Sequence, residues 1–259
     1  MIDEGKILNL CFFFQVCHCK VVFFRFPYNG KLILFFPMLN SAFIDFSDKV
    51  SSHTLSLFDL NKKCQNHQMI SKSRGFTSEM LAVPEQIHSA DITYIDTPGE
   101  YVGTDGLITD NPEIILVIKV ADCVPVYLYE PRSQLIGLVH SGWRGTAGGI
   151  VPNAVRKMLK MGADKKEVNV FLGPAIGFCC YEVDRDVADN FNKNTKRKME
   201  SGKWKVGLHE NICLQLAEIG IPSNNIMASD ICTFESQDCH SYRRDGEKSG
   251  RMFAFMGLQ

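Results

Sequence analysis

The stretch Gln134–Ile150, QLIGLVHSGWRGTAGGI, decides which fold and which chemistry the sequence can support. Its apolar run Leu135–Val139 is typical of a short strand that is buried on both faces. His140 follows where that strand is expected to end, so its ring can point into a cleft while the strand fixes its backbone. The small residues that come next allow a tight turn and a close approach of other groups to the backbone. The stretch therefore predicts a strand, a histidine at its end, and a turn into a helix.

An anion-binding feature is expected at the start of that helix, which we predict to begin near Gly145 or Thr146. Helix N-termini present free backbone N–H groups and a partial positive charge, and both favour phosphate or carboxylate groups. Arg144 adds a full positive charge beside them. The sequence thus predicts a metal ligand or base, His140, next to a site for an anion.

Length and composition favour one large domain. The 259 residues can bury a substantial core, and no linker rich in Pro, Gly, Ser or charge divides them. The net charge of −1 and the pI near 6.6 give no electrostatic case for nucleic acid or a membrane as partner. The ten cysteines show no disulfide or zinc-finger spacing, so we expect mostly buried free thiols and a cytoplasmic protein.

Residues 1–40 form the most apolar and aromatic part of the sequence. The uncharged run Ile7–Cys19 is too short to span a bilayer, and no cleavage site of small residues follows it. We therefore expect a β-hairpin with Asn29-Gly30 at its turn, and mostly loop in residues 41–80.

From Leu81 onward, the pattern of apolar residues predicts strands interspersed with helices. A break in the extended structure is expected at Asp122-Cys123, because Pro125 lacks the N–H that a sheet ladder needs. Strands are expected over residues 92–95, 114–120, 126–129, 168–172 and 226–233. The helix that begins near Gly145 or Thr146 is expected to continue through Leu159, and further helices are expected over residues 184–191 and 208–219.

Three side chains are candidate metal ligands: His88, Cys123 and His140. Each follows or interrupts an apolar strand, and they lie 35 and 17 positions apart. No local knuckle can hold residues at such spacings, so three strand ends would have to converge. Two imidazoles and a thiolate then suit tetrahedral zinc, with the fourth position left for water or substrate. The alternative at each position is a side chain satisfied within the core.

Five motifs occur in order within residues 83–258: QIHSADI, ADCVPV, HSGWRGTAGG, GPAIGFCCYEV and SYRRDGEKSGRM. They closely resemble a family described as laccase-domain proteins, multicopper polyphenol oxidoreductases, peptidoglycan editing factors and zinc-dependent purine nucleoside phosphorylases. The resemblance places the family's metal ligands on His88, Cys123 and His140. It also implies an α+β fold: a single domain over the whole chain, with mixed β-sheets flanked by helices, in a cysteine-hydrolase-like laccase-domain fold.

The resemblance is weaker in residues 1–60. Family members usually carry an FSTRxGG-type segment, whereas the nearest stretch here, Ala42–Ser51, has neither the arginine nor the glycine pair. If that arginine contacts substrate, the activity of this chain would be weakened, lost or redirected.

The resemblance implies a zinc enzyme, with copper as a substitute ion, that phosphorolyses adenosine, inosine or methylthioadenosine and deaminates adenosine. Phosphorolysis needs a held phosphate and a stabilised leaving base. Asp105, in a glycine-flanked turn, is the candidate general acid/base or ribose contact, with turn capping as the alternative. The candidates for the phosphate site are Arg144, the N–H groups of Gly145 and Thr146, and Arg243 or Arg244, with structural ion pairs as the alternative for each arginine.

Two other functions fit the same residues. Cys123 as a thiolate nucleophile and His140 as its base would make a metal-free cysteine hydrolase. Such hydrolysis would suit the editing of muropeptide precursors, as would hydrolysis at zinc. A non-catalytic zinc scaffold would instead need a fourth protein ligand, for which Cys179, Cys180 and Cys239 are available.

Copper-dependent oxidation of polyphenols is the least favoured interpretation. A multicopper cluster would require histidines in His-x-His pairs, and the sequence has seven histidines and no such pair. Cys232 with Cys239-His240 is a candidate for a separate small metal site, with ordinary core packing as the alternative. Neither the physiological substrate nor the oligomeric state follows from the sequence.

Overall fold

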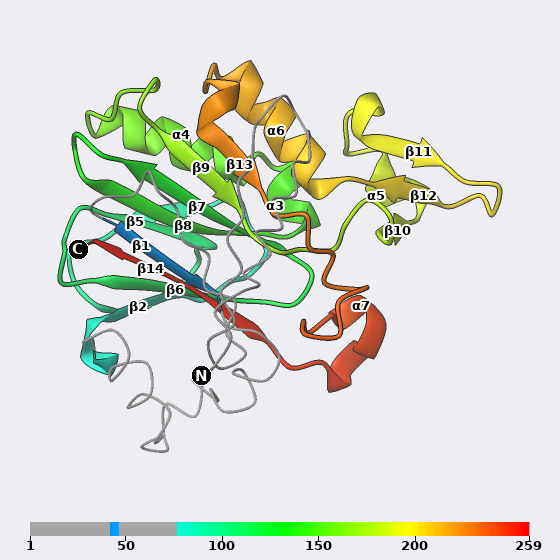
Figure 1. Cartoon of the computed structure of the whole chain (residues 1–259), viewed down its shortest axis with the longest axis horizontal. Coiled ribbons are helices and arrows are strands. Elements are labelled where there is room, and N and C mark those ends of the chain that lie inside the picture. Colours follow the sequence, from blue (N-terminus) through cyan, green and yellow to red (C-terminus); the bar gives the residue numbers. More distant parts are fainter. Residues whose placement is uncertain (1–41, 47–76, 259) are drawn as a thin grey trace, which may run out of the picture.

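A computed structural model of the protein describes residues 42–46, as backbone only, and residues 77–258. The hairpin predicted for residues 1–40 lies outside this part of the chain. Within the described residues, no helix is long and apolar enough to cross a membrane. The expected fold class is confirmed, because mixed sheets and a few helices make up an α+β arrangement (Figure 1).

The first sheet has five strands and mixes parallel with antiparallel pairs. Their order is β1 (Ala42–Phe46), β14 (Met252–Leu258), β6 (Ile115–Val120), β2 (Leu81–Pro84) and β4 (Gly99–Tyr101). β14 is antiparallel to both neighbours, whereas β2 is parallel to β6 and to β4. Residues 41–80 were expected to be mostly loop, and β1 is a strand within them: all five of its residues pair with β14, so that apolar strand does not form a sheet edge.

The second sheet has six strands and contains the central stretch of the sequence. Their order is β13 (Ile226–Ala228), β9 (Asn169–Leu172), β7 (Val124–Glu130), β8 (Leu135–Ser141), β5 (Gly106–Thr109) and β3 (Ile92–Tyr94). Every residue of β7 and β8 is buried, as the continuous apolar run predicted. The predicted break at Asp122-Cys123 is confirmed: there the chain leaves β6 in the first sheet and enters β7 in the second.

The two sheets pack against each other and form one part of the core. A single buried cluster joins Leu116, Ile118 and Met256 of the first sheet to Tyr127 and Leu138 of the second. Burial of large apolar side chains contributes about 1.5–3 kcal/mol each. This packing fixes the position of the β6–β7 connection relative to both sheets.

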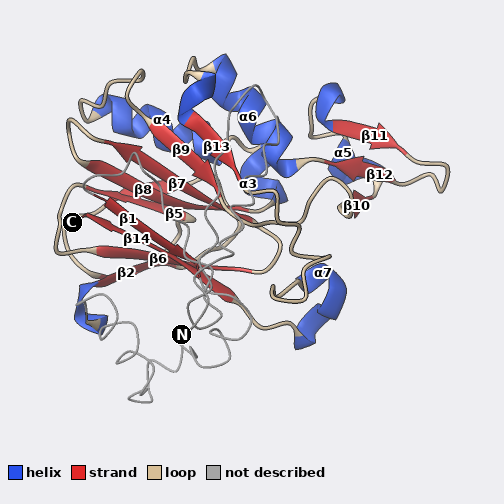
Figure 2. Cartoon of the chain, in the orientation of Figure 1, coloured by secondary structure: helices blue, strands red, loops and turns tan. Residues whose placement is uncertain are grey.

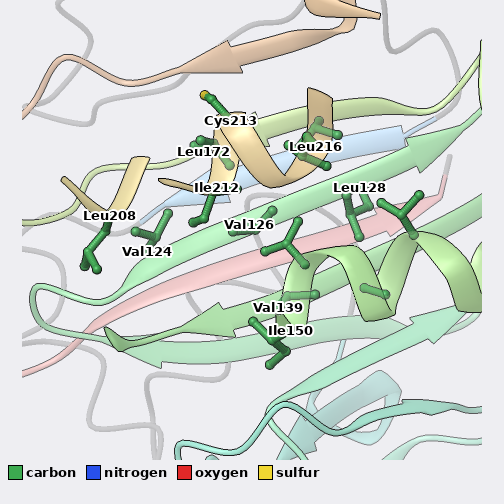
Figure 3. Close-up of a cluster of buried hydrophobic side chains, with 14 of the residues drawn as sticks. Val124, Val126, Leu128, Val139, Ile150, Leu172, Leu208, Ile212, Cys213 and Leu216 are labelled. Carbon is green, nitrogen blue, oxygen red and sulfur yellow. The ribbon is translucent and has the colours of Figure 1, made fainter. Parts of the chain in front are cut away.

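Two helices cover the other face of the six-stranded sheet, α4 (Ile150–Lys160) and α6 (Leu208–Glu218). Figure 3 shows the cluster of side chains from these helices and from β7, β8 and β9 that closes this layer. The prediction of a helix at 208–219 is confirmed. The helix predicted to begin near Gly145 or Thr146 starts earlier, as the short α3 (Trp143–Ala147), and a left-handed Gly149 (φ 73°) separates it from α4.

The small strands and helices of residues 182–206 lie together to one side of the sheets (Figure 2). Asn190 and Asn192 are poor helix formers, so the helix predicted at 184–191 is reduced to four residues. The strand predicted at 226–233 ends at Ala228, because Thr233 turns away to bond a residue of the β6–β7 connection. The remaining elements of the described residues are β10 (Glu182–Val183), β11 (Lys196–Lys198), β12 (Trp204–Val206), α5 (Arg185–Ala188), α7 (Tyr242–Asp245) and the 3₁₀ turns Ser78–Met80, Lys193–Thr195, Ser223–Asn225 and Gly246–Lys248.

Candidate metal centre

Three side chains from distant parts of the sequence converge where the two sheets meet. His88 lies in the loop after β2, Cys123 in the turn between β6 and β7, and His140 near the end of β8. One ligand atom of each, an imidazole nitrogen or the Sγ atom, lies within 4.8 Å of the other two. His88 is exposed, Cys123 is half-buried and His140 is only 4% exposed, so solvent reaches the cluster from the side of His88.

The backbone that carries these ligands adopts conformations that L-residues rarely adopt. Gln86 and His88 both have φ 63°, and Asp122 has φ 84°; each such residue costs of order 1–3 kcal/mol. The Gln86 side chain holds the first loop in place, because its Nε2 donates to the Lys119 carbonyl (2.7 Å) and its Oε1 accepts from the Lys119 N–H (2.9 Å). Sequence reasoning did not single out Gln86, although it opens the motif QIHSADI.

Gly142 allows the ligands to approach each other. A Cβ atom at this position would lie 3.0 Å from His88 Cδ2 and 3.1 Å from Cys123 Sγ, which is tighter than nearly all real Cβ contacts. The close approach predicted for the small residues after His140 is therefore observed here, and it involves two of the three candidate ligands.

Asp105 lies behind the ligands and is fully buried. Its Oδ1 accepts from the His88 N–H (2.9 Å) and lies 2.8 Å from His140 Nδ1, while its Oδ2 accepts from the Ser89 N–H (2.6 Å) and the Ser89 hydroxyl (2.9 Å). Burial alone would raise the pKa of the Asp105 carboxyl, but the bonds with His140 and Ser89 lower it overall. No part of the Asp105 side chain reaches solvent, and its bond to His140 Nδ1 leaves the Nε2 atom of His140 for a ligand. The role of Asp105 as general acid/base or ribose contact stays a prediction.

Charge in the metal-free site is concentrated on Cys123 and His140. Burial disfavours the thiolate, yet the His140 and His88 imidazoles lower the pKa of Cys123 to about 6. Burial likewise disfavours the imidazolium, yet Cys123 and Asp105 raise the pKa of His140 to about 9. Near pH 7 the metal-free site therefore holds a thiolate beside an imidazolium.

Asp122 joins the Cys123 turn to a segment more than a hundred residues later in the sequence. Its carboxylate accepts from the Thr233 hydroxyl (2.6 Å) and from the backbone N–H of Arg243 (2.7 Å). These bonds bring the motif SYRRDGEKSGRM to the candidate metal centre, and they place Arg243 beside it.

Tyr181 is a residue at the site that sequence reasoning missed, although it stands within the motif GPAIGFCCYEV. The Arg243 guanidinium lies over its ring, 5.0 Å from the centroid. Burial raises the pKa of Tyr181 to about 12; Arg243 and Arg144 oppose that rise, and Cys123 and Asp122 add to it. Tyr181 is therefore a neutral hydroxyl close to one candidate ligand and to two predicted phosphate contacts.

Arg144 and Arg244 differ in what they can contribute to an anion site. The exposed Arg144 guanidinium lies 4.2 Å over the Trp143 ring and has no hydrogen-bond acceptor among the described residues. Arg244 is different, because its guanidinium is fully occupied, which rules out the predicted phosphate contact. Its partners are the carbonyl oxygens of Thr233, Phe234, Ser236 and Cys239 and the carboxylate of Asp245.

The helix start next to Arg144 offers fewer donors than expected. The Thr146 N–H donates to the Gly142 carbonyl (2.8 Å), and the buried Thr146 hydroxyl bonds with Ser141 (2.8 Å). The predicted phosphate contact from Thr146 is therefore wrong, since α3 begins three residues earlier and uses that amide itself. Gly145 is packed closely, with a Cβ at its position 3.0 Å from the Ser89 carbonyl.

Comparison with known proteins identifies the family. A family model described as multi-copper polyphenol oxidoreductase laccase matches residues 58–259. The chain belongs to this laccase family. The match begins near the end of residues 1–60, the part in which the sequence motifs are weakest.

Relatives within the laccase family are named as nucleoside enzymes. Purine nucleoside phosphorylase YlmD of Geobacillus stearothermophilus is 36% identical over 211 residues, which covers 74% of this chain and 77% of the relative. A purine nucleoside phosphorylase of Clostridium acetobutylicum is 30% identical, covering 83% of this chain and 95% of its own length. The crystal structure of YlmD from Geobacillus stearothermophilus superposes with a TM-score of 0.83 over 91% of this chain and 98% of that one, at 31% identity.

The donor set decides which metals this laccase-family site suits. Two imidazoles and one thiolate fit a tetrahedral zinc site with one open position, and the same donors also occur in copper sites. The residues therefore fit one resident ion of either metal. Among the described residues, the other group of candidate ligands contains no histidine, so it does not supply the imidazoles of a larger copper cluster.

A fourth ligand for this ion was considered among Cys179, Cys180 and Cys239. In the described part of the chain, none of these three groups with His88. Cys179 is the one exposed thiol among the cysteines that the structure describes. The open position predicted for a catalytic site is thus consistent with the arrangement of the described residues.

Proposed function

We propose that this chain is a zinc-dependent purine nucleoside phosphorylase that also deaminates adenosine. The observation that carries the proposal is the convergence of His88, Cys123 and His140 on one solvent-accessible point, with Asp105 orienting His140 from behind. The names of relatives at 30–36% identity support nucleosides and phosphate as substrates.

His88, Cys123 and His140 would hold the ion. When bound, zinc would supply a Lewis acid that stabilises negative charge and activates water near neutral pH. The protein's own contribution is to fix the ligands: Asp105 sets the His140 tautomer, and Gly142 admits both His88 and Cys123 at close range.

Arg144 and Arg243 are the proposed phosphate contacts. Arg144 is exposed and stacked on Trp143, and Arg243 is held beside the Cys123 turn by Asp122. In phosphorolysis, a phosphate oxygen forms a bond to C1′ of the ribose while the C1′–N bond breaks and its electron pair leaves with the purine. Arg144 and Arg243 would hold the nucleophile in place for this step.

The test uses zinc-loaded protein with adenosine, inosine and methylthioadenosine, each with and without phosphate. Free base that appears only with phosphate supports phosphorolysis, and inosine formed from adenosine supports deamination. Cys123→Ser should abolish both activities. Failure of every nucleoside to react with the zinc-loaded wild type would overturn the proposal.

Arg144→Gln should raise the KM for phosphate with little change in the KM for nucleoside. Loss of a charge-assisted hydrogen bond costs about 1.5–3 kcal/mol, or roughly tenfold or more in binding. Arg132→Gln is the matched control, because Arg132 is an exposed arginine paired with Glu167 beyond the other end of β7. Equal effects of the two substitutions would contradict a phosphate role for Arg144.

A cysteine hydrolase is the second candidate function. The thiolate–imidazolium pair of Cys123 and His140 in the metal-free site favours it, because such a pair activates a nucleophilic cysteine. Metal analysis separates the two functions. Zinc that is bound by the wild type and lost in Cys123→Ser, with activity that requires the ion, excludes the free nucleophile.

A further inference from the structure

A second group of candidate ligands lies apart from the one described above. It consists of Cys179 and Cys180 from the segment between β9 and β10, and Cys232 and Glu235 from the segment between β13 and α7. Their sulfur and carboxylate oxygen atoms all lie within 4.8 Å of one another. The three cysteines are free thiols.

The backbone around this group is already ordered to bring the two segments together. Ala175 and Cys232 form an isolated parallel bridge, and the Thr233 N–H donates to the Ala175 carbonyl (3.0 Å). The Gly177 N–H donates to Cys232 Sγ (3.3 Å). An N–H bond to sulfur stabilises a thiolate more than a thiol, and the thiolate is the form that binds a metal.

Gly177 provides the space in which the sulfur atoms meet. A Cβ atom at this position would lie 3.1 Å from Cys179 Sγ and 3.5 Å from Cys232 Sγ. Tetrahedral zinc with Zn–S bonds of about 2.3 Å places its sulfur atoms about 3.8 Å apart. The observed limit of 4.8 Å is therefore within about 1 Å of the required spacing, which side-chain rotation of an exposed Cys179 can supply.

We propose that Cys179, Cys180, Cys232 and Glu235 form a second metal site, which binds Zn²⁺ through three thiolates and one carboxylate. Thiolate-rich sets of this kind select soft or borderline ions such as zinc. With four protein ligands the site is closed, as in structural zinc sites. It differs from the earlier expectation for this region, because Cys232 groups with Cys179 and Cys180 rather than with Cys239-His240.

The second site would stabilise the two segments that border the first. Tyr181 directly follows Cys180, and Thr233, which bonds Asp122, directly follows Cys232. An ion held between these segments would fix the positions of Tyr181 and Thr233 beside the Cys123 turn. The second ion would therefore contribute to the order of the first site without contacting substrate.

The test is metal content and Cd²⁺ titration, each measured on the purified full chain kept in reductant. Cys232→Ser should bind about one zinc fewer than the wild type, and so should Cys123→Ser, since each removes a different site. Cd–thiolate absorbance should fall by about three quarters in Cys232→Ser and by about one quarter in Cys123→Ser, in proportion to the thiolates at each site. Cys213→Ser is the control, because Cys213 lies in α6 outside both groups and should change neither value.

Glu235→Gln and Cys179→Ser test the same site at exposed positions, where a substitution should not prevent folding. Each should weaken Cd²⁺ binding at the second site while the circular dichroism spectrum stays unchanged. Equal metal content and Cd–thiolate absorbance in the wild type and Cys232→Ser would overturn the proposal. So would a disulfide among the three cysteines, found by mass spectrometry, that persists in reductant and excludes metal.

Discussion

Replacing Asp105 by asparagine should separate the orienting role of this residue from its role in stability. The wild-type carboxylate accepts four hydrogen bonds while fully buried, one of them shared with His140 Nδ1. In Asp105→Asn, one terminal atom becomes an NH₂ donor. The NH₂ group then faces either the two Ser89 donors or the N–H groups of His88 and His140. In both orientations at least one buried donor loses its acceptor.

The expected loss has two parts. A buried donor without an acceptor costs about 1–3 kcal/mol of unfolding free energy. Removing the carboxylate behind a metal-binding histidine typically costs about 10–100-fold in metal affinity, because the tautomer and ring orientation of His140 are no longer fixed. Urea unfolding of the metal-free protein measures the first part, and competition with a chromogenic zinc chelator measures the second.

Glu130→Gln is the matched control for this experiment. Glu130 is also fully buried, and its carboxylate accepts from the Arg132 and Ser133 N–H groups and from the Ser133 hydroxyl. It lies at the opposite end of β7 and contacts no candidate ligand, so it should lose similar stability and keep its zinc affinity. If Asp105→Asn binds zinc as tightly as the wild type, or Glu130→Gln loses as much affinity, the orienting role of Asp105 is refuted.

Three further results are expected. Gly142→Ala should lower zinc affinity about tenfold or more. The new methyl group would displace His88 and Cys123 by several tenths of an ångström, which exceeds the tolerance of about 0.2 Å in ligand distances. Isothermal titration measures the affinity, and an unchanged value would contradict this prediction. Zinc binding at pH 7 should release about one proton. His140, whose pKa is raised to about 9, must lose its proton to bind the ion, whereas Cys123, whose pKa is lowered to about 6, is already a thiolate. Calorimetric titration in two buffers of different ionisation enthalpy measures the proton release, and a binding enthalpy that does not depend on the buffer would contradict this prediction. The unfolding free energy of the metal-free protein should change little between about pH 6.5 and pH 9, because the Cys123 contribution grows as pH rises toward 9 while the His140 contribution is lost over the same range. Urea unfolding at several pH values measures this, and a steep slope from these two groups within that range would refute the ion pair.

The central strands and the longest helices were predictable because their signals are local. β8 is a run of buried apolar residues, and the 3.6-residue period of α6 is visible in Leu208, Ile212 and Leu216. β1 was not predictable in this way, since its identity as a strand depends on pairing with β14 at the other end of the sequence. Long-range pairing of this kind leaves little trace in a single sequence.

The candidate ligands were predictable from motifs, whereas their supporting residues were not. His88, Cys123 and His140 each stand at a strand end among small residues, and the family resemblance selects them. The burial of Asp105 depends on where the His88–Ser89 loop lies, and the full occupation of the Arg244 guanidinium depends on four separate carbonyl groups and the Asp245 carboxylate. Such contacts are properties of the folded chain, so neither the burial of Asp105 nor the carbonyl partners of Arg244 can be predicted from a single sequence.

The location of the candidate metal centre between the sheets links enzyme abundance to metal supply. His88 follows a strand of one sheet, His140 belongs to the other, and Cys123 lies on the connection between them. A bound ion would therefore cross-link the two layers, adding about 4 kcal/mol to folding at a thousandfold excess over its Kd. Without that ion the chain would open to proteolysis more often, so the concentration of this protein would follow the supply of the metal.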